Sequence, residues 1–417
     1  MEINKELLLI GQKAKNASRR LSFSGTQAKN KALTAMAGAL KERQEEILRA
    51  NALDVQAAEE KGLRKSLVNR LRLTKETIQE MSRSLEEVVS LPDPVGGGEF
   101  WTRPNGLRIQ KTRVPLGVVA MIYEARPNVT VDAAALCIKS GNACILRGGS
   151  EAIESNKVLA KVIAEAAEEN GLPEGSIQLV GMTDREYALQ LMKMNKYIDV
   201  IIPRGGAGLI QTVIENSTIP VIETGTGVCH AFVDKDADFA KAVSIVFNAK
   251  TQKPGVCNAL ETLLVHQDVA GEYLPLIGKK FQDFGVEIRG CEKVLRVLEY
   301  ATQAEAEDWG TEYLDLIISV KVVKDLDEAL DHIYMYSTKH SETIITENYT
   351  AAQRFLHEID AAAVYVNAST RFTDGGRFGF GAEIGISTQK LHSRGPMALP
   401  ELTTIKYIIY GDGQIVT

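Results

Sequence analysis

The sequence predicts an α/β protein built on a doubly wound parallel sheet, followed by a second α/β unit and accompanied by a small β element. Short apolar runs alternate with helical stretches from residue 114 to about 225, and a second alternating pattern follows residue 230. Before them, from about residue 3 to 90, apolar residues recur at helical intervals. Strands and helices in alternation are typical of a parallel sheet with helices on its faces.

The opening section is expected to be helical. Leu33, Met36, Leu40 and Ile47 recur at intervals that place them on one face of a helix. The segment 91–98, Leu-Pro-Asp-Pro-Val-Gly-Gly-Gly, then interrupts this pattern with prolines and glycines. A change of structural unit is therefore expected there.

A β-hairpin is expected next. The segment from Trp101 to Arg113 places Asn105-Gly106 between two short runs suited to strands, which is a strong hairpin signal. Such a hairpin is either ordinary surface structure or an edge for another subunit's sheet. The tail from Thr403 to Thr417 is rich in branched and aromatic residues and predicts further β-structure.

The first alternating unit predicts four strands and the helices between them. The strands are expected at 118–122, 143–146, 177–180 and 200–202, and the helices near 130–140, 151–170 and 184–195. Ligands of such sheets bind at the carboxyl ends of the strands, where helix N-termini offer N–H groups to phosphate. The turns Arg147-Gly-Gly-Ser150 and 203–208, Pro-Arg-Gly-Gly-Ala-Gly, are expected at such positions.

The glycines of these turns are a weak signal by themselves. Gly206-Ala-Gly208 begins a dinucleotide-binding fingerprint, but no third glycine follows at the usual place. A tight turn without a ligand is the alternative. The ligand-binding interpretation is favoured because both turns carry an arginine and follow what we expect to be successive strands of one sheet.

The second alternating unit predicts strands at 263–265, 316–320, 343–346 and 363–366. A chain of 417 residues is expected to form two to three domains. The net charge of −6 argues against a nucleic-acid partner. The sequence has no apolar run long enough to span a bilayer, and the N-terminus lacks the order of a secretory signal, so a cytoplasmic location is expected.

The cysteines are expected to be free thiols. They number five, at 137, 144, 229, 257 and 291, and include no Cys-x-x-Cys pair. This odd, wide spacing suggests neither a disulfide framework nor a thiolate metal site. The histidines include no His-x-x-x-His pair either, so no metal is expected.

Cys257 is the candidate nucleophile. It follows Pro254-Gly255 and precedes an apolar run, so it is expected on a turn before a strand. Lys250 and Lys253 lie upstream, and positive charge favours the thiolate, which is the attacking species. A buried structural cysteine is the alternative from this segment alone.

The order of these features resembles the aldehyde dehydrogenase superfamily over nearly the whole chain. Within it, the γ-glutamyl phosphate reductases are the most similar family. The strings that carry this resemblance are 122–130 (IYEARPNVT), 137–142 (CIKSGN), 147–149 (RGG), 252–257 (QKPGVC) and 379–385 (GFGAEIG), together with 223–227 (ETGTG) ahead of Cys257. The resemblance implies NADPH-dependent reduction of L-glutamyl 5-phosphate to the 5-semialdehyde, the second step of proline biosynthesis from glutamate.

The resemblance implies that Cys257 forms a thioester, because an acyl phosphate transfers its acyl group to a thiolate and hydride can reduce the product. It implies Asn128 as an oxyanion donor, with a turn-forming asparagine as the alternative. Glu223 matches the position of the wider superfamily's general base for thioester hydrolysis. In a reductase it could instead help to deprotonate Cys257, contact the nicotinamide region, or be structural.

The resemblance also implies binding residues for NADPH or NADP and for the substrate. Arg147 stands where the wider superfamily has a lysine near the adenine ribose, and a guanidinium suits a 2′-phosphate. Glu312 matches the glutamate that holds the nicotinamide ribose, although a surface glutamate would look identical. The remaining implied cofactor residues are Gly148, Gly205, Gly206, Gly208 and Thr224. The implied substrate residues are Arg126, Ser369, Thr370, Arg371 and Arg377. For the arginines among them, the alternative is that they are solvated surface residues.

The implied organisation is an NADP-binding domain of residues 1–98 and 115–228, a catalytic domain of residues 229–400, and an oligomerisation element of residues 99–114 and 401–417. A homo-oligomer is expected from it, and association with a glutamate kinase is compatible with it. Two other functions stay open at this point. One is an aldehyde oxidiser that hydrolyses its thioester, and the other is a binding module that has lost its chemistry.

Overall fold

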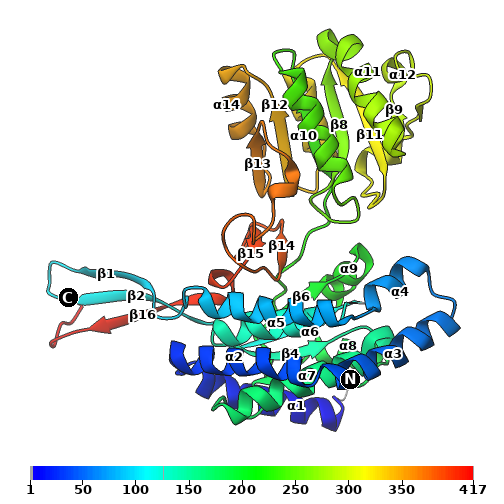
Figure 1. Cartoon of the computed structure of the whole chain (residues 1–417). Coiled ribbons are helices and arrows are strands. Elements are labelled where there is room, and N and C mark those ends of the chain that lie inside the picture. Colours follow the sequence, from blue (N-terminus) through cyan, green and yellow to red (C-terminus); the bar gives the residue numbers. More distant parts are fainter. Residues whose placement is uncertain (1–2, 125, 417) are drawn as a thin grey trace. The chain divides into compact units, whose positions relative to one another are not determined.

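The computed structural model describes residues 3–124 and 126–416 and divides them into two compact units (Figure 1). Unit 1 comprises residues up to Thr224 together with Gly379–Gly385 and the segment from Met397 onward. Unit 2 comprises Gly225–Phe378 and Ile386–Pro396. No helix among the described residues is long and apolar enough to cross a membrane.

Unit 1 opens with the expected helical section and continues with alternating strands and helices. Its helices are α1 (Lys5–Leu21), α2 (Thr26–Glu42), α3 (Gln44–Glu60), α4 (Lys65–Leu71), α5 (Lys75–Ser90), α6 (Asn128–Lys139), α7 (Ile153–Glu169), α8 (Arg185–Leu191) and α9 (Ala207–Asn216). Side chains cap several of them. The Oδ1 of Asn4, for example, accepts from the backbone N–H of Glu6 at the start of α1.

The central sheet of unit 1 is parallel and has the order β5-β4-β3-β6. Its strands are β3 (Val118–Tyr123), β4 (Ala143–Arg147), β5 (Ile177–Leu179) and β6 (Val200–Arg204). Alternate residues of β3 enter two different cores. Val119 and Met121 pack with apolar residues of α2, α5, α6 and α7, whereas Ala120 and Ile122 pack with those of α1 and α8. The sheet is therefore buried on both faces, as expected for a doubly wound sheet.

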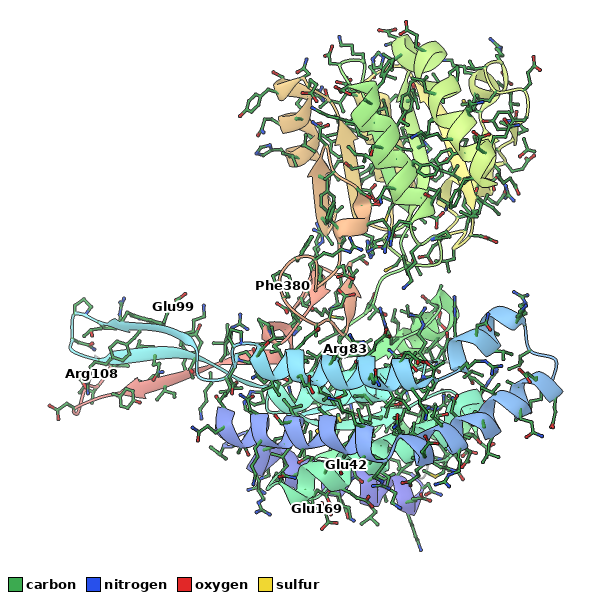
Figure 2. All side chains as sticks on the ribbon, viewed as in Figure 1. Glu42, Arg83, Glu99, Arg108, Glu169 and Phe380 are labelled. Carbon is green, nitrogen blue, oxygen red and sulfur yellow. The ribbon has the colours of Figure 1, made fainter. Side chains whose placement is uncertain are left out.

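The predicted hairpin and tail form one antiparallel sheet of order β1-β2-β16. Strands β1 (Gly98–Thr102) and β2 (Arg108–Pro115) pair around the predicted turn, and β16 (Thr403–Tyr410) pairs with β2 along its whole length. Side chains stand on both faces of this sheet, and Glu99 and Arg108 are labelled on it in Figure 2. The hairpin prediction is confirmed as local structure.

Unit 2 contains a parallel sheet of order β10-β9-β11-β8-β7-β12-β13. Its strands are β7 (Cys229–Val233), β8 (Leu260–His266), β9 (Glu287–Gly290), β10 (Thr302–Gln303), β11 (Ile317–Val323), β12 (Ser341–Ile345) and β13 (Ala363–Val366). Its helices are α10 (Phe239–Thr251), α11 (Gln267–Phe284), α12 (Glu292–Leu295), α13 (Leu326–Tyr336) and α14 (Tyr349–Glu358). A two-stranded sheet, β14 (Gly385–Ser387) with β15 (Gly395–Met397), lies near the C-terminus of the chain.

Helices cover both faces of the unit 2 sheet. Leu263 and Val265 of β8 pack with apolar residues of α10 and α11, and Leu264 packs with those of α13 and α14. The predicted fold class, two α/β units with parallel sheets and a small β element, is confirmed. Strands β7, β9, β10, β14 and β15 were not predicted from the sequence.

The compact units differ from the predicted domain bounds near the C-terminus. Residues 379–385 and 397–400 were assigned to the catalytic domain but group with unit 1. The reason is packing, because Ile384, Met397 and Leu399 are buried in the same core as helices α2, α5 and α6. The functional names of the domains stay predictions.

Candidate active site

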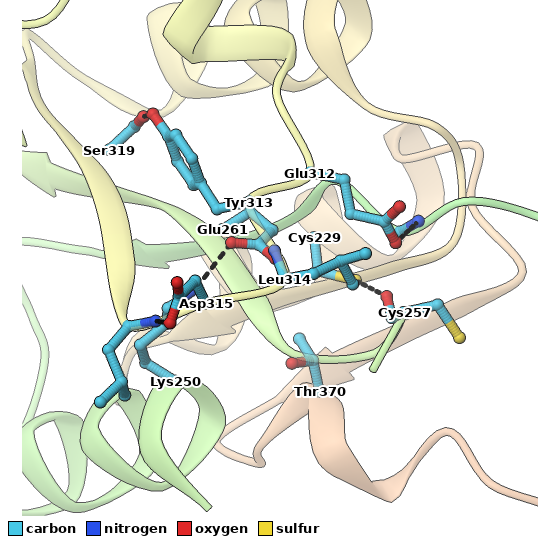
Figure 3. A network of polar contacts seen from close by, with 12 residues as sticks. Cys229, Lys250, Cys257, Glu261, Glu312, Tyr313, Leu314, Asp315, Ser319 and Thr370 are labelled. Carbon is cyan, nitrogen blue, oxygen red and sulfur yellow. Dashed lines mark hydrogen bonds and ion pairs between the residues drawn. The ribbon is translucent and has the colours of Figure 1, made fainter. Parts of the chain in front are cut away.

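Cys257 lies on a turn at the amino end of β8, as predicted. The turn follows α10 and is closed by the backbone N–H of Ala259, which donates to the carbonyl of Val256 at 3.0 Å. Cys257 is half-buried, whereas Cys137, Cys144 and Cys229 are buried. Its sulfur points away from Cys229 in Figure 3.

A neighbouring segment packs tightly against the Cys257 turn. A Cβ added to Gly227 would lie 1.5 Å from the carbonyl oxygen of Cys257, so only glycine permits this approach. Cys229, two residues later, donates its S–H to the same carbonyl oxygen at 3.2 Å. Burial raises the pKa of the Cys229 thiol well above its ordinary value, which keeps it protonated as a donor. Cys229 was not singled out from the sequence, because its spacing from Cys257 carries no signal.

Glu312 is joined to this arrangement. Its Oε1 accepts from the backbone N–H of Gly227 at 2.7 Å, and its side chain is partly buried. Burial raises the pKa of Glu312, and the hydrogen bond from Gly227 opposes that rise. Glu312 is therefore fixed beside the turn of the candidate nucleophile instead of being an isolated surface residue.

The predicted segment 369–371 also contacts the Cys257 turn. Asn258, directly after the nucleophile, donates its Nδ2 to the carbonyl of Thr373 at 2.7 Å, and its own carbonyl accepts from the Oγ1 of Thr370 at 2.7 Å. The Oγ of Ser369 accepts from the backbone N–H of Arg371 at 3.3 Å. The structure thus brings Ser369, Thr370 and Arg371 to the candidate nucleophile.

Arg371 and Arg377 lie in different environments. Arg371 is buried and donates its Nε to the Oε1 of Gln252 at 3.0 Å, just ahead of the Cys257 turn. Burial lowers the pKa of Arg371, and the neighbouring Arg377 lowers it further. Arg377 is exposed, and its guanidinium lies 5.9 Å from the ring centre of Phe372. Of these two arginines, Arg371 is the one whose guanidinium a neighbouring side chain holds.

Lys250, one of the two lysines expected to favour the Cys257 thiolate, forms a buried ion pair. Its Nζ lies 2.6 Å from the Oε2 of Glu261, and both side chains are fully buried. Its charge is therefore matched by a carboxylate and is not that of an isolated cation beside the thiol. A pair eleven residues apart, on α10 and β8, cannot be recognised from the sequence without knowing how the two elements pack.

The turn after β6 fits the expected phosphate-binding geometry. Gly206 is the N-cap of α9, and the first N–H groups of a helix have no partner within the helix. Gly205, Gly206 and Gly208 are exposed. The backbone N–H of Gly206 donates to the Oε2 of Glu124 at 3.0 Å, so an anion of the protein itself contacts this helix end.

The turn after β4 differs from this expectation. The N-terminus of α7 is capped by Asp54 of α3, whose Oδ2 accepts from the backbone N–H of Ser155 at 2.7 Å and whose Oδ1 accepts from that of Glu154 at 3.1 Å. This helix end is therefore occupied by a carboxylate of the chain. The two turns also do not follow successive strands, because β5 lies between them in sequence and β3 lies between β4 and β6 in the sheet.

Gly148 is required by packing, because an added Cβ would lie 2.1 Å from the Nδ2 of the buried Asn156. Arg147, next to it, is partly buried and donates from its guanidinium to the carbonyl of Thr183 at 3.1 Å. Burial lowers the pKa of Arg147. The side chain is thus oriented at the carboxyl end of β4.

The other predicted residues of unit 1 are Arg126, Asn128, Glu223 and Thr224. Asn128 is the first residue of α6, and its Nδ2 donates to the Oδ2 of Asp132 at 3.0 Å. Burial raises the pKa of Asp132. Thr224 is buried and donates its Oγ1 to the carbonyl of Pro203 at 2.8 Å. Arg126 is exposed and Glu223 is partly buried.

Comparisons with known proteins agree with this architecture. A model of the aldehyde dehydrogenase family matches residues 5–289. A protein of Desulfitobacterium hafniense (strain Y51) named gamma-glutamyl phosphate reductase is 73% identical over 417 residues, covering all of both chains. Its namesake from Heliobacterium modesticaldum is 61% identical over 416 residues, with 100% of each chain covered.

Solved structures give the same result. The crystal structure of gamma-glutamyl phosphate reductase from Thermotoga maritima matches with a TM-score of 0.97 at 52% identity, over 99% of this chain and 100% of that one. An acetylating aldehyde dehydrogenase from Geobacillus thermoglucosidasius matches with a TM-score of 0.72 at 19% identity, over 99% of this chain and 98% of that one. The latter likeness concerns the fold alone.

Proposed function

The chain belongs to the aldehyde dehydrogenase family, and from this premise we propose that it reduces L-glutamyl 5-phosphate to L-glutamate 5-semialdehyde with release of phosphate. The reaction is the second step of proline biosynthesis from glutamate. The observation that carries the proposal is identity along the whole chain to relatives named gamma-glutamyl phosphate reductase. A nicotinamide cofactor follows from the family, and NADPH is the form proposed here.

Cys257 is proposed as the nucleophile. Its thiolate attacks the acyl carbon of the acyl phosphate, a carbon–sulfur bond forms, and phosphate leaves with the electrons of the carbon–oxygen bond. The product is a thioester on Cys257. When bound, the reduced nicotinamide supplies the hydride that converts this thioester to the aldehyde and returns the thiolate.

Two donors are proposed for the oxyanion that forms during acylation and reduction. One is the backbone N–H of Cys257, and the other is the amide of Asn128. Asn128 suits this role because Asp132 holds one of its N–H groups and so fixes the plane of the amide. For Glu223, two roles are proposed as alternatives: help in deprotonating Cys257, or contact with the nicotinamide region.

The residues of unit 1 fit a dinucleotide cofactor. Gly205, Gly206 and Gly208 expose backbone at the start of α9, which suits the cofactor's phosphates. Glu124 already accepts from Gly206, so a bound phosphate competes with this carboxylate for that N–H group. Thr224 supports the cofactor site from the end of unit 1, through its bond to Pro203.

Three further residues are proposed to hold the cofactor. Arg147 is proposed to bind the 2′-phosphate and so to favour NADPH over NADH. Gly148, beside it, lets the chain turn close to the adenine ribose. Glu312 is proposed to hold the nicotinamide ribose, and its fixed position next to Gly227 supports this role.

The substrate carries negative charge on its phosphate and on its α-carboxylate, so its proposed contacts are cationic. Arg371 is the best placed, because Gln252 fixes its Nε beside the nucleophile's turn and the terminal nitrogens of a guanidinium suit a carboxylate or phosphate. Ser369 and Thr370 complete this pocket. Arg126 and Arg377 are proposed as further contacts.

We also propose a homo-oligomer that works in the cytoplasm. Apolar side chains on one face of β16 support the oligomer, since Ile405, Tyr407 and Ile409 are each about half exposed on an edge strand. A glutamate kinase that supplies the labile acyl phosphate is a proposed partner.

The proposal is tested by trapping the acyl-enzyme. The protein is mixed with enzymatically generated glutamyl 5-phosphate without cofactor, and its peptides are examined by mass spectrometry. A glutamyl adduct is expected on the peptide that contains Cys257, and added NADPH should discharge it. If no adduct forms on Cys257 without cofactor, although the same protein oxidises NADPH when both substrates are present, the thioester route is refuted.

A further inference from the structure

The segment from Thr311 to Leu316, here called the Glu312 segment, has an unusual backbone. It links a short 3-10 helix (Ala306–Gly310) to β11 and contains no regular structure. Leu314 lies in the left-handed region with φ of 55°. A non-glycine residue there costs on the order of 1–3 kcal/mol and persists only where surrounding contacts impose it.

A buried ion pair supplies one of these contacts. The Oε1 of Glu261 accepts from the backbone N–H of Leu314 at 3.2 Å, while its Oε2 lies 2.6 Å from the Nζ of Lys250 (Figure 3). Neither side chain of the pair is exposed. Burial raises the pKa of Glu261 to about 7 and lowers that of Lys250, so each charge depends on the other.

Tyr313 fixes the same segment through a second set of contacts. Its hydroxyl donates to the Oδ1 of Asp308 at 2.9 Å and shares a 2.7 Å hydrogen bond with the Oγ of Ser319. The Nζ of Lys250 lies 6.0 Å from the centre of the Tyr313 ring. Lys250 is therefore linked to Leu314 through Glu261, and it also lies near the ring of Tyr313, the residue before Leu314.

These contacts hold the two residues that follow Glu312 in the chain. Glu312 precedes Tyr313 and Leu314 and accepts from Gly227, whose backbone touches the carbonyl of Cys257. Glu261 itself stands on β8, four residues after the nucleophile. One buried carboxylate thus links the strand that follows the Cys257 turn to the segment that carries Glu312.

We propose that the Lys250–Glu261 ion pair is a positioning element that holds Glu312 in place to bind the nicotinamide end of the cofactor. This inference rests on the proposed function, in which Glu312 contacts the nicotinamide ribose. Stability alone does not account for the pair, because apolar residues of similar volume often replace a buried ion pair without loss. Apolar residues could not, however, supply the hydrogen-bond acceptor that Glu261 offers to the backbone N–H of Leu314.

The test uses the double variant K250M/E261M, which removes both charges together and leaves no unpaired buried ion. The dissociation constant of NADPH is expected to rise about tenfold. That of 2′,5′-ADP, which lacks the nicotinamide, should stay at the wild-type value. Hydrogen exchange of residues 311–316 in the cofactor-free protein should accelerate. The matched control is K241M/E347M, which removes an exposed pair whose lysine also stands on α10 and should change none of these values.

Combining the double variant with E312Q separates a role of the ion pair in positioning Glu312 from a general loss of structure. In an E312Q background, K250M/E261M should cause no further loss of NADPH affinity, because the residue it positions is already altered. If E312Q by itself leaves NADPH binding unchanged, the proposed role of Glu312 fails. If E312Q weakens binding but K250M/E261M binds like the wild type, or loses NADPH and 2′,5′-ADP equally, the positioning role is overturned.

A second variant keeps the test open if the double variant does not fold. K250M retains Glu261, and the ratio of the NADPH and 2′,5′-ADP dissociation constants is then measured in it. The ratio should exceed that of the wild type, because Glu261 without Lys250 no longer has the cation that holds it in place. A ratio equal to the wild-type value contradicts the proposal.

Discussion

The side chain of Cys257 can be tested separately from the rest of the site. Cys257→Ser should abolish turnover, because a hydroxyl lacks the nucleophilicity of a thiolate near neutral pH. NADPH binding, measured by titration, should be retained. Cys291→Ser is the matched control, since Cys291 is also half-buried but lies at the end of β9. Wild-type turnover in the Cys257 variant would disprove the mechanism.

Arg147 provides a test of cofactor choice. Arg147→Ala should weaken NADPH binding by about 1.5–3 kcal/mol, the value of a hydrogen bond to a charged group, and should affect NADH much less. Titration of the variant with both cofactors measures the difference. An equal loss of affinity for NADPH and NADH would show that Arg147 does not bind the 2′-phosphate.

Single residues were predictable from the sequence where the residue type and its local turn carry the signal. Cys257 is such a case, because a cysteine after Pro-Gly and before an apolar run specifies its own turn. The Lys250–Glu261 pair and the bond from Cys229 to Cys257 were not predictable. They depend on how α10, β7 and β8 pack, and no local pattern encodes that packing.

The three-stranded sheet can be tested as an element. Tyr407→Lys with Ile409→Lys places two charges on the half-exposed apolar face of β16, where Trp101 and Tyr407 pack with ring centres 6.3 Å apart. The sedimentation coefficient should fall because the proposed subunit contact is lost. Ile415→Lys adds a charge to an exposed tail residue outside the strand and should change nothing. Unchanged sedimentation of the double variant would show that the sheet is only local structure.

Most strands with a strong local signal were predicted, although the buried and largely apolar β7 was missed. The hairpin was found because Asn105-Gly106 specifies its turn, and β3, β4, β6 and β8 because they are continuous apolar runs. The short β9 and β10 lack such runs and are strands only because a neighbouring strand offers an edge, β11 for β9 and β9 for β10. The cap of α7 by Asp54 was also invisible, since about a hundred residues separate the two.

The stability of the folded chain should depend on His332 below neutral pH. His332 is buried against His230, Trp309 and Tyr336, and its Nδ1 lies 3.3 Å from the Nζ of Lys321. Burial, with repulsion from His230 and Lys321, lowers its pKa to about 2. The unfolded chain takes up this proton below about pH 6.5 while the folded chain does not, so stability falls as the pH falls.

The size of this effect follows from the pKa difference. Between pH 7 and pH 5 the wild type should lose about 2 kcal/mol more unfolding free energy than His332→Phe, which keeps an aromatic ring but cannot take up a proton. Urea unfolding at both pH values measures the difference, and other titrating groups cancel because both proteins share them. Parallel losses in the two proteins would contradict the assignment.

The proposed activity requires phosphate, and not water, as the partner of the acyl group. In the reverse direction, glutamate 5-semialdehyde and NADP should give an acyl-enzyme on Cys257 that phosphate releases. NADPH formation should therefore rise from near zero with added phosphate and saturate, and arsenate should replace phosphate because it is a tetrahedral oxyanion of similar shape. An aldehyde oxidiser would instead release its thioester with water activated by a base such as Glu223. Full-rate multiple turnovers in phosphate-free buffer, with free glutamate as the product, would contradict the acyl-phosphate mechanism.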